Sequence, residues 1–308
     1  MKFKIQFLLF LFSITLFSQE LNFTTQEVPI NVYIDGTLLI PNAIEKPNLV
    51  IIIAGSGPTD RNGNQNFAKN NSLKKLAQGL SNSGIATFRY DKRVVKQIKK
   101  RNVDPNILFD DFVTDAISVL KYFKTENKYN KIYIAGHSQG SLIGMLSAKE
   151  GADGYISIAG AGNTIDMIIL DQISSSAPVF TKDSKRIFSI LKEGKTTDDY
   201  PPPLASIFNK DIQLFMANWM QYNPQEEIKK LNMPILIING TKDLQVPIEE
   251  ANLLKNANPD SEFLIIENMN HVLVPIKGND NLENSKSYNE PLRALSPELI
   301  EGIIKFVK

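Results

Sequence analysis

One serine of the sequence is placed for nucleophilic catalysis, within the pentapeptide Gly-His-Ser-Gln-Gly at residues 136–140. A β-prone apolar run precedes this pentapeptide and helix-compatible residues follow it, which is the strand–turn–helix context of a nucleophile elbow. A serine on so sharp a turn is held under backbone strain, and the flanking glycines remove side chains that would clash with the neighbouring strand and helix. We therefore predict that Ser138 is a nucleophile. The alternative is a Gly-rich turn that carries an ordinary exposed serine.

The sequence offers two histidines as the base that a serine hydroxyl needs to lose its proton. His137 adjoins Ser138, and adjacent residues at a strand end point to opposite sides, so we expect His137 to pack at the elbow without reaching the hydroxyl. His271 follows an apolar run that ends at Ile266, where a loop at the carboxyl edge of a parallel sheet would deliver it. His271 is therefore the predicted base.

The acid that orients this histidine should follow another strand. Asp243 comes directly after an apolar run and before a helical segment, and serine enzymes with a nucleophile elbow use the order Ser138, Asp243, His271. Taken alone, Asp243 could equally be a turn former or a helix cap. Asp166 is a second candidate, and Glu267 ranks below both because it is so close to His271 in the sequence. We predict that Asp243 is the acid.

A serine hydrolase also needs two fixed N–H donors for the developing oxyanion. The backbone N–H of Gln139 is one predicted donor, because it directly follows the nucleophile. The N–H of Ser56 is the other, because the Gly-rich loop at 54–58 lets backbone approach a substrate closely. A phosphate-binding loop is the weaker interpretation, since neither G-x-G-x-x-G nor the P-loop lysine pattern is present. We expect Asp60 and Arg61 to order this loop through ion pairing.

The elements that must position these residues alternate along the chain. An antiparallel hairpin is expected at 28–40, with Asp35 and Gly36 as its turn. Apolar runs typical of strands buried on both faces follow at 49–54, 85–90, 131–135, 154–159, 234–239 and 262–266. Helical periodicity lies between them at 72–81, 108–124, 142–149 and 248–256, and a last helix is expected from 296 to the end. The pattern predicts an α/β fold with a mostly parallel central sheet covered on both faces.

One interval, residues 163–232, breaks this alternation. It holds no strand-like run, and helices are expected at 165–174, 183–192 and 204–222, the last two separated by three prolines. We interpret it as a helical lid inserted between the core segments 19–162 and 233–308. Its apolar residues could line an acyl pocket, although such a stripe is more often ordinary packing: Met167, Ile168, Phe215, Met216, Trp219 and Met220. Residues 277–291 are polar and predict a surface loop.

The composition limits the possible functions. The 308 residues carry a net charge of +1, which gives no electrostatic argument for binding nucleic acid or an anionic membrane. The absence of cysteine excludes disulfides, a thiol nucleophile and thiolate metal sites, and two histidines make a histidine-rich metal site a poor interpretation. Residues 1–18 read as a signal peptide, with an uncleaved anchor as the alternative. We expect an exported protein, periplasmic or secreted, with no stable membrane anchor after cleavage.

The chain resembles members of the α/β-hydrolase superfamily, and more narrowly secreted or periplasmic bacterial serine carboxylesterases. The resemblance rests on the stretches 55–64, 89–93, 136–140, 239–247 and 270–271 in that order. It implies a carboxylesterase that forms an acyl-enzyme on Ser138, with His271 as base then acid, Asp243 orienting the imidazole, a helical lid and no cofactor. Similar proteins usually have glycines where Val94 and Val95 stand and often an aspartate at Asn62, so the loops flanking the pocket differ here.

Three functions are weighed. The first is hydrolysis of small to medium acyl esters. The second is a peptidase resembling prolyl oligopeptidases, although the acidic residues that would grip a peptide amine cannot be placed in the sequence. The third is an exported binding protein that keeps the fold without catalysis.

Overall fold

The structure is a computed structural model that describes residues 22–278 and 280–308. The predicted signal peptide at 1–18 lies outside the described residues. Among the described residues, no helix has both the length and the apolar character that crossing a membrane requires.

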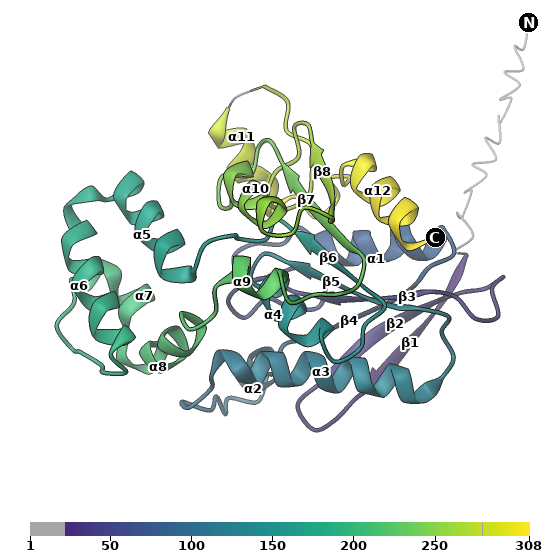
Figure 1. The fold of residues 1–308 in the computed structure, drawn as a ribbon, viewed down its shortest axis with the longest axis horizontal. Helices are drawn as coiled ribbons and strands as arrows, with labels where there is room; N and C mark the ends of the chain where they lie inside the picture. Colours follow the sequence, from purple (N-terminus) through teal and green to yellow (C-terminus); the bar gives the residue numbers. More distant parts are fainter. Residues whose placement is uncertain (1–21, 279) are drawn as a thin grey trace, which may run out of the picture.

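An eight-stranded sheet forms the centre of the molecule, in the order β1-β2-β4-β3-β5-β6-β7-β8 (Figure 1). β1 and β2 pair antiparallel, β2 is antiparallel to β4, and the remaining neighbours are parallel. The strands are β1 (Phe23–Pro29), β2 (Asp35–Pro41), β3 (Leu49–Ile53), β4 (Ala86–Tyr90), β5 (Ile132–His137), β6 (Gly154–Ile158), β7 (Ile235–Gly240) and β8 (Glu262–Ile266). The predicted mostly parallel sheet is therefore present.

Helices cover both faces of the sheet because the central strands are apolar on both sides. Alternate residues of β3 belong to two hydrophobic clusters, with Ile51 in one and Val50 and Ile52 in the other. One face is covered by α3 (Phe109–Glu126), α4 (Gln139–Ala148), α9 (Pro224–Ile228) and α10 (Ile248–Ala257). The other is covered by α1 (Ser72–Asn82) and α12 (Pro297–Val307), which lie on the opposite side of the sheet from α3 in Figure 1.

The expected hairpin is present, but its turn is not at Asp35 and Gly36. Both residues belong to β2, and the turn lies at 30–34, where the side-chain oxygen of Asn31 accepts the N–H groups of Tyr33 and Ile34 at 2.9 Å each. Position 36 instead requires glycine for steric reasons, because a methyl group there would lie 2.3 Å from the Phe88 ring. The prediction of a turn at Asp35 and Gly36 was therefore wrong.

Residues 163–232, which we call the helical insertion, leave the sheet between β6 and β7 and lie to one side of it (Figure 1). Its helices are α5 (Ile165–Ser176), α6 (Thr181–Lys192), α7 (Ala205–Phe208) and α8 (Lys210–Trp219), followed by α9 on the core. These helices have a hydrophobic cluster of their own, built around Ile187, Leu191, Phe208 and Met216. The helix expected over 204–222 is divided at Asn209, whose side chain caps α8 by accepting the N–H of Asp211.

The segment at 277–291 is more than the expected surface loop. It contains α11 (Asn281–Lys286), and the side chains of Asn284 and Ser287 are buried. Asn270 Nδ2 donates to Asn284 Oδ1 and to Ser287 Oγ, both at 2.8 Å. This polar segment therefore braces the loop that carries His271. Elsewhere, directly after β4, the structure has a further helix that was not predicted, α2 (Arg93–Lys99).

Candidate active site

Ser138 lies between β5 and α4 in a conformation that few residues other than glycine adopt, with φ 56° and ψ −121°. The neighbouring glycines make this turn possible. A methyl group on Gly136 would lie 2.0 Å from the carbonyl oxygen of Gly140, and one on Gly140 would lie 2.5 Å from that of Ile53. The strain and the close approaches are those of a nucleophile elbow.

Asp243 and His271 form a buried hydrogen-bonded pair at the ends of β7 and β8. His271 Nδ1 lies 2.8 Å from Asp243 Oδ2, and the side chains are 6% and 0% exposed. The other carboxylate oxygen accepts the backbone N–H groups of Gln245 at 2.8 Å and Val246 at 2.9 Å. Since an ionised carboxylate only accepts, Nδ1 carries the proton and Nε2 is left as the basic nitrogen. Ser138 and His271 line one cavity, so the structure brings the predicted triad together.

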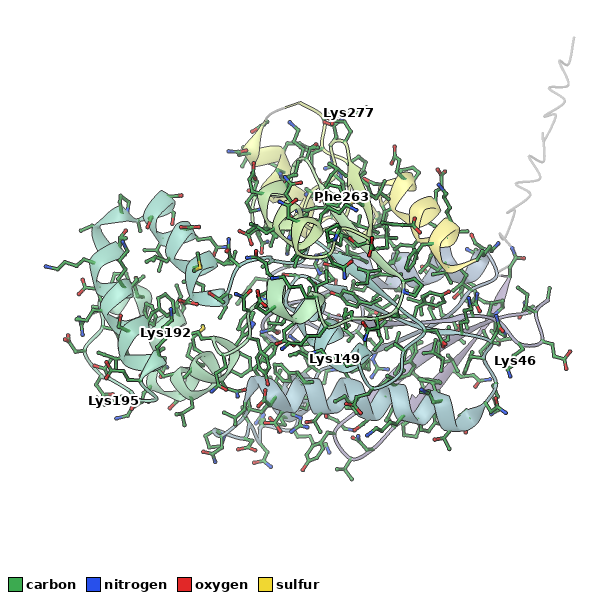
Figure 2. The ribbon with its side chains drawn as sticks, viewed as in Figure 1. Lys46, Lys149, Lys192, Lys195, Phe263 and Lys277 are labelled. Atoms are coloured by element: carbon green, nitrogen blue, oxygen red, sulfur yellow. The ribbon has the colours of Figure 1, made fainter. Side chains whose placement is uncertain are left out.

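The competing acids lie elsewhere. Asp166 is in the helical insertion, where its carboxylate pairs at 2.6 Å with Lys192, labelled on that insertion in Figure 2. Glu267 is exposed to solvent. Of the three acids considered, only Asp243 contacts the imidazole.

His137 connects the loop of Ser138 with the loop of His271. Its Nε2 lies 2.8 Å from the backbone oxygen of His271, and the two rings are 4.8 Å apart. Burial, with a smaller contribution from nearby His271, lowers the pKa of His137 to about 4. His137 is therefore neutral near pH 7, and its Nε2–H donates to the carbonyl of the base.

Asn270 is the supporting residue that the sequence analysis missed. It is 1% exposed, and besides its side-chain bonds to Asn284 and Ser287 its backbone pairs with Val274. Its position next to the predicted base was the one available signal, because buried amides with several partners cannot be recognised from composition. Asn270 fixes the loop that presents His271.

The predicted oxyanion donors lie beside the nucleophile. Ser56 and Gln139 line the same cavity as Ser138, and in the described part of the chain neither backbone N–H has an acceptor. The carbonyl of Ser56 accepts from Thr59 Oγ1 at 2.7 Å, which helps to hold the loop. A methyl group on Gly55 would lie 3.2 Å from Ser138 Cβ, so backbone approaches the nucleophile closely at this point. Two N–H groups without an acceptor, placed here, can stabilise a developing oxyanion by donating hydrogen bonds to it.

Arg61 orders the loop that follows, through acids other than the neighbouring Asp60. Its guanidinium pairs with Glu27 at 2.5 Å, Asp35 at 2.7 Å and Asp91 at 3.1 Å. Asp60 instead accepts backbone N–H groups within its own loop. The prediction that Arg61 forms ion pairs is confirmed. Its partners, however, lie on β1, on β2 and at the end of β4.

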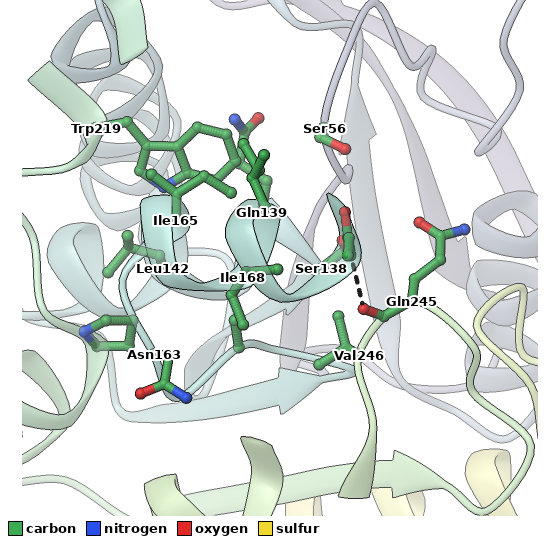
Figure 3. Close-up of a pocket in the computed structure, with 14 residues that line it drawn as sticks. Ser56, Ser138, Gln139, Leu142, Asn163, Ile165, Ile168, Trp219, Gln245 and Val246 are labelled. Carbon is green, nitrogen blue, oxygen red and sulfur yellow. Dashed lines mark hydrogen bonds between the residues drawn. The ribbon is translucent and has the colours of Figure 1, made fainter. Parts of the chain in front are cut away.

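Ser138 lines two cavities, and a third adjoins its neighbours Ser56 and Gln139. One cavity, of about 220 Å³, is lined by Leu142, Ile165, Ile168, Trp219 and Val246 but also by polar residues such as Asn163, Gln172 and Gln245; we call it the apolar cavity for its larger apolar share (Figure 3). The polar cavity, about 260 Å³, lies on the His271 side and is lined by side chains such as Thr59, Gln65, Asn70 and Tyr288. The α8 cavity, about 440 Å³, adjoins Ser56 and Gln139 and is walled by Phe112, Ile212, Phe215 and Trp219. Trp219 thus lines both the apolar and the α8 cavity.

Among the residues that the structure describes, no three His, Asp or Glu side chains are grouped so that they could hold a metal ion. The predicted acid–base pair beside Ser138 is that of Asp243 and His271.

Comparisons with known proteins point to one superfamily. A family model described as BD-FAE matches residues 37–257. Esterase EstD of Thermotoga maritima is 25% identical over 264 residues, which is 83% of this chain and 62% of EstD. The chain therefore spans less than two thirds of that relative.

Solved structures show the same fold. The Butyrivibrio proteoclasticus protein Est1E with bound ferulic acid is 18% identical, with a TM-score of 0.57 over 92% of this chain and 99% of Est1E. An alpha-beta serine hydrolase homologue from Coxiella burnetii is also 18% identical, with a TM-score of 0.51 over 92% of this chain and 97% of that one. The predicted α/β-hydrolase fold is confirmed.

Proposed function

The chain belongs to the BD-FAE family, and we propose that it is a serine carboxylesterase acting through an acyl-enzyme on Ser138. The observation that carries the proposal is the strained serine at a cavity that His271, hydrogen-bonded to the buried Asp243, also lines. The similarity to Esterase EstD supports the same reaction.

The geometry accounts for each step. His271 Nε2 takes the proton of the Ser138 hydroxyl as the oxygen attacks the ester carbonyl, and the N–H groups of Ser56 and Gln139 stabilise the tetrahedral oxyanion. The imidazolium then donates its proton to the alcohol oxygen, the carbon–oxygen bond breaks, and the acyl group stays on Ser138. Water, deprotonated by the same nitrogen, attacks the acyl-enzyme; the bond between the acyl carbon and Ser138 Oγ then breaks, the imidazolium returns its proton to Oγ, and the acid is released. Asp243 stabilises the imidazolium in both halves.

The cavities suggest how an ester lies across the nucleophile. Since His271 must protonate the leaving oxygen, the alcohol lies on the His271 side, in the polar cavity. The acyl group then occupies the apolar cavity on the other side of Ser138. We therefore propose an ester of an apolar acid with a hydroxyl-bearing alcohol. The ferulic acid bound to Est1E, an aromatic acid, agrees with an apolar acyl site.

Two other functions fit less well. A peptidase that grips a peptide amine needs an acidic side chain beside Ser138. In the described part of the chain no acid lines the apolar or the polar cavity, and Asp104 and Asp211 line only the α8 cavity, which Ser138 does not line. A binding protein has no use for a serine held at φ 56° beside a buried His–Asp pair. The esterase reading accounts for both features.

Labelling with a fluorophosphonate, followed by peptide mapping, tests the proposal directly. We expect the label on the peptide that contains Ser138, hydrolysis of aryl esters, and no labelling of Ser138→Ala. The loss in kcat for that variant should be about 10⁴-fold or more, because the nucleophile has no substitute. A folded wild type that neither labels nor hydrolyses esters would overturn the proposal, and turnover of peptide anilides in place of esters would favour the peptidase.

A further inference from the structure

Lys92 is a buried cation that the mechanism above does not use. It follows β4 and caps the start of α2, and only 2% of its surface is exposed. Its charged neighbours in the sequence are paired elsewhere, Asp91 with Arg61 and Arg93 with Asp111 and Asp115. Within the described part of the chain Lys92 has no carboxylate partner. Burial without such a partner is unfavourable for an ammonium group.

The contacts of Lys92 converge on the two predicted oxyanion donors. Its Nζ donates to the carbonyl oxygen of Gly55 and lies 3.2 Å from Oε1 of Gln139. The ring of Phe112 lies 5.1 Å from Nζ and provides the remaining favourable contact. One ammonium therefore touches the residues on both sides of the oxyanion site.

The bond to Gly55 acts on Ser56 because the two residues share one peptide group. The carbonyl of Gly55 and the N–H of Ser56 belong to the same planar unit, and no peptide bond among the described residues is cis. In a trans peptide these two groups point in opposite directions. Holding the carbonyl toward Lys92 thus turns the N–H away from it and polarises that N–H as a donor.

We propose that Lys92 is a positioning residue for the oxyanion hole, orienting the Gly55–Ser56 peptide and the Gln139 side chain and adding a fixed positive charge behind them. The inference rests on the proposed esterase function and deepens it. The low polarity around the ammonium strengthens its field at the oxyanion. Burial lowers the pKa of Lys92 to about 7, so the ammonium form prevails below that pH and its burial costs stability.

The test compares Lys92→Met with Lys75→Met in the full chain. Lys75 is a matched control because its half-buried ammonium also donates to a backbone carbonyl, that of Arg293, away from the site. We expect Lys92→Met to lower kcat for aryl esters by about 10- to 100-fold with KM within about threefold, since a weakened donor should matter less than a lost one. Lys75→Met should keep wild-type kcat.

Two further readouts separate positioning from a purely structural role. Affinity for a trifluoromethyl ketone, which forms a tetrahedral adduct with the serine, should fall by the same factor as kcat/KM. Lys92→Arg, which keeps a cation, should recover more kcat than Lys92→Gln. Because the wild-type residue buries an unpaired charge, Lys92→Met should fold at least as well as the wild type, and Lys92→Gln replaces it in the comparison if it does not.

The failures are distinguishable. A folded wild type without esterase activity overturns both the proposed function and this inference. An active wild type whose folded neutral variants at Lys92 keep full kcat and inhibitor affinity overturns this inference alone.

Discussion

The carboxyl edge of the sheet and the helical insertion meet at the apolar cavity, yet they are built in different ways. At the sheet edge, Asp243 and His271 are buried and held by hydrogen bonds from backbone and side chains of neighbouring loops. The insertion has a separate hydrophobic cluster and contributes cavity walls such as Ile168 and Trp219, but none of the predicted triad. The difference suggests that the reaction and the choice of acyl group can be altered separately.

Hydrogen bonds attach the insertion to the core near both of its ends. At its start, Glu250 of α10 accepts the N–H groups of Gly162 and Asn163 at 2.8 Å each. Near its end, Tyr222 donates to Asp110 of α3 at 2.6 Å. These buried or half-buried bonds hold both ends of the insertion against the helices that cover the sheet, so its cavity walls are placed by the core.

The largest expected effect is at the sheet edge. Asp243→Asn should lower kcat by about 10³- to 10⁴-fold, because an amide cannot stabilise the imidazolium and can favour the wrong tautomer. KM for short esters should change by less than about threefold, since Asp243 does not line the apolar cavity. Steady-state kinetics on an aryl acetate, with circular dichroism as a folding control, measures this. A folded variant within tenfold of wild-type kcat would contradict the assignment of Asp243.

A change in the insertion should instead shift selectivity. Trp219→Ala removes the largest of the side chains that line both the apolar and the α8 cavity, and we expect this to open one into the other. The ratio of kcat/KM for decanoyl over acetyl esters should rise by about 10- to 100-fold, as each additional buried methylene contributes about 0.8 kcal/mol. Activity on acetyl esters should change little.

Leu214→Ala is the matched control for Trp219→Ala, because Leu214 lies on the same helix and is exposed. It should leave the acyl-length profile unaltered. An unchanged profile in Trp219→Ala as well would mean that the insertion does not select the acyl group.

The smallest expected effect concerns the bond between the loop of Ser138 and the loop of His271. The pKa of His137 is about 4 in the folded protein and about 6.5 in the unfolded chain, so the unfolded state binds more protons between these values. This contribution to stability is complete above pH 6.5 and is lost as the pH falls toward 4. Between pH 7 and pH 5 the loss should be about 2 kcal/mol.

Urea unfolding of the wild type and of His137→Gln at both pH values isolates this contribution. Glutamine does not titrate in this range. From pH 7 to pH 5, the free energy of unfolding of His137→Gln should therefore fall by about 2 kcal/mol less than that of the wild type. Equal losses in the two proteins would show that His137 is not the group responsible.

Much of the site could be predicted because its signals are local. Gly136 is required by a close backbone approach to nearby Gly140, and the order of Ser138, Asp243 and His271 follows from the loops after β5, β7 and β8. The roles of these three residues remain predictions until labelling and kinetics test them. Where a local signal had two explanations, as at Gly36, the sequence led to the wrong turn.

The sequence by itself determined the strands, the strained elbow and the candidate triad, since alternation, apolar runs and glycine spacing act within a few residues. Only the tertiary structure decided that Lys92 lies unpaired behind Gly55 and Gln139, and that Asn270 is braced by a polar segment that follows it. In the sequence Lys92 is one charge among several. Its burial depends on which distant segments pack around it, and that depends on the whole sheet and its helices.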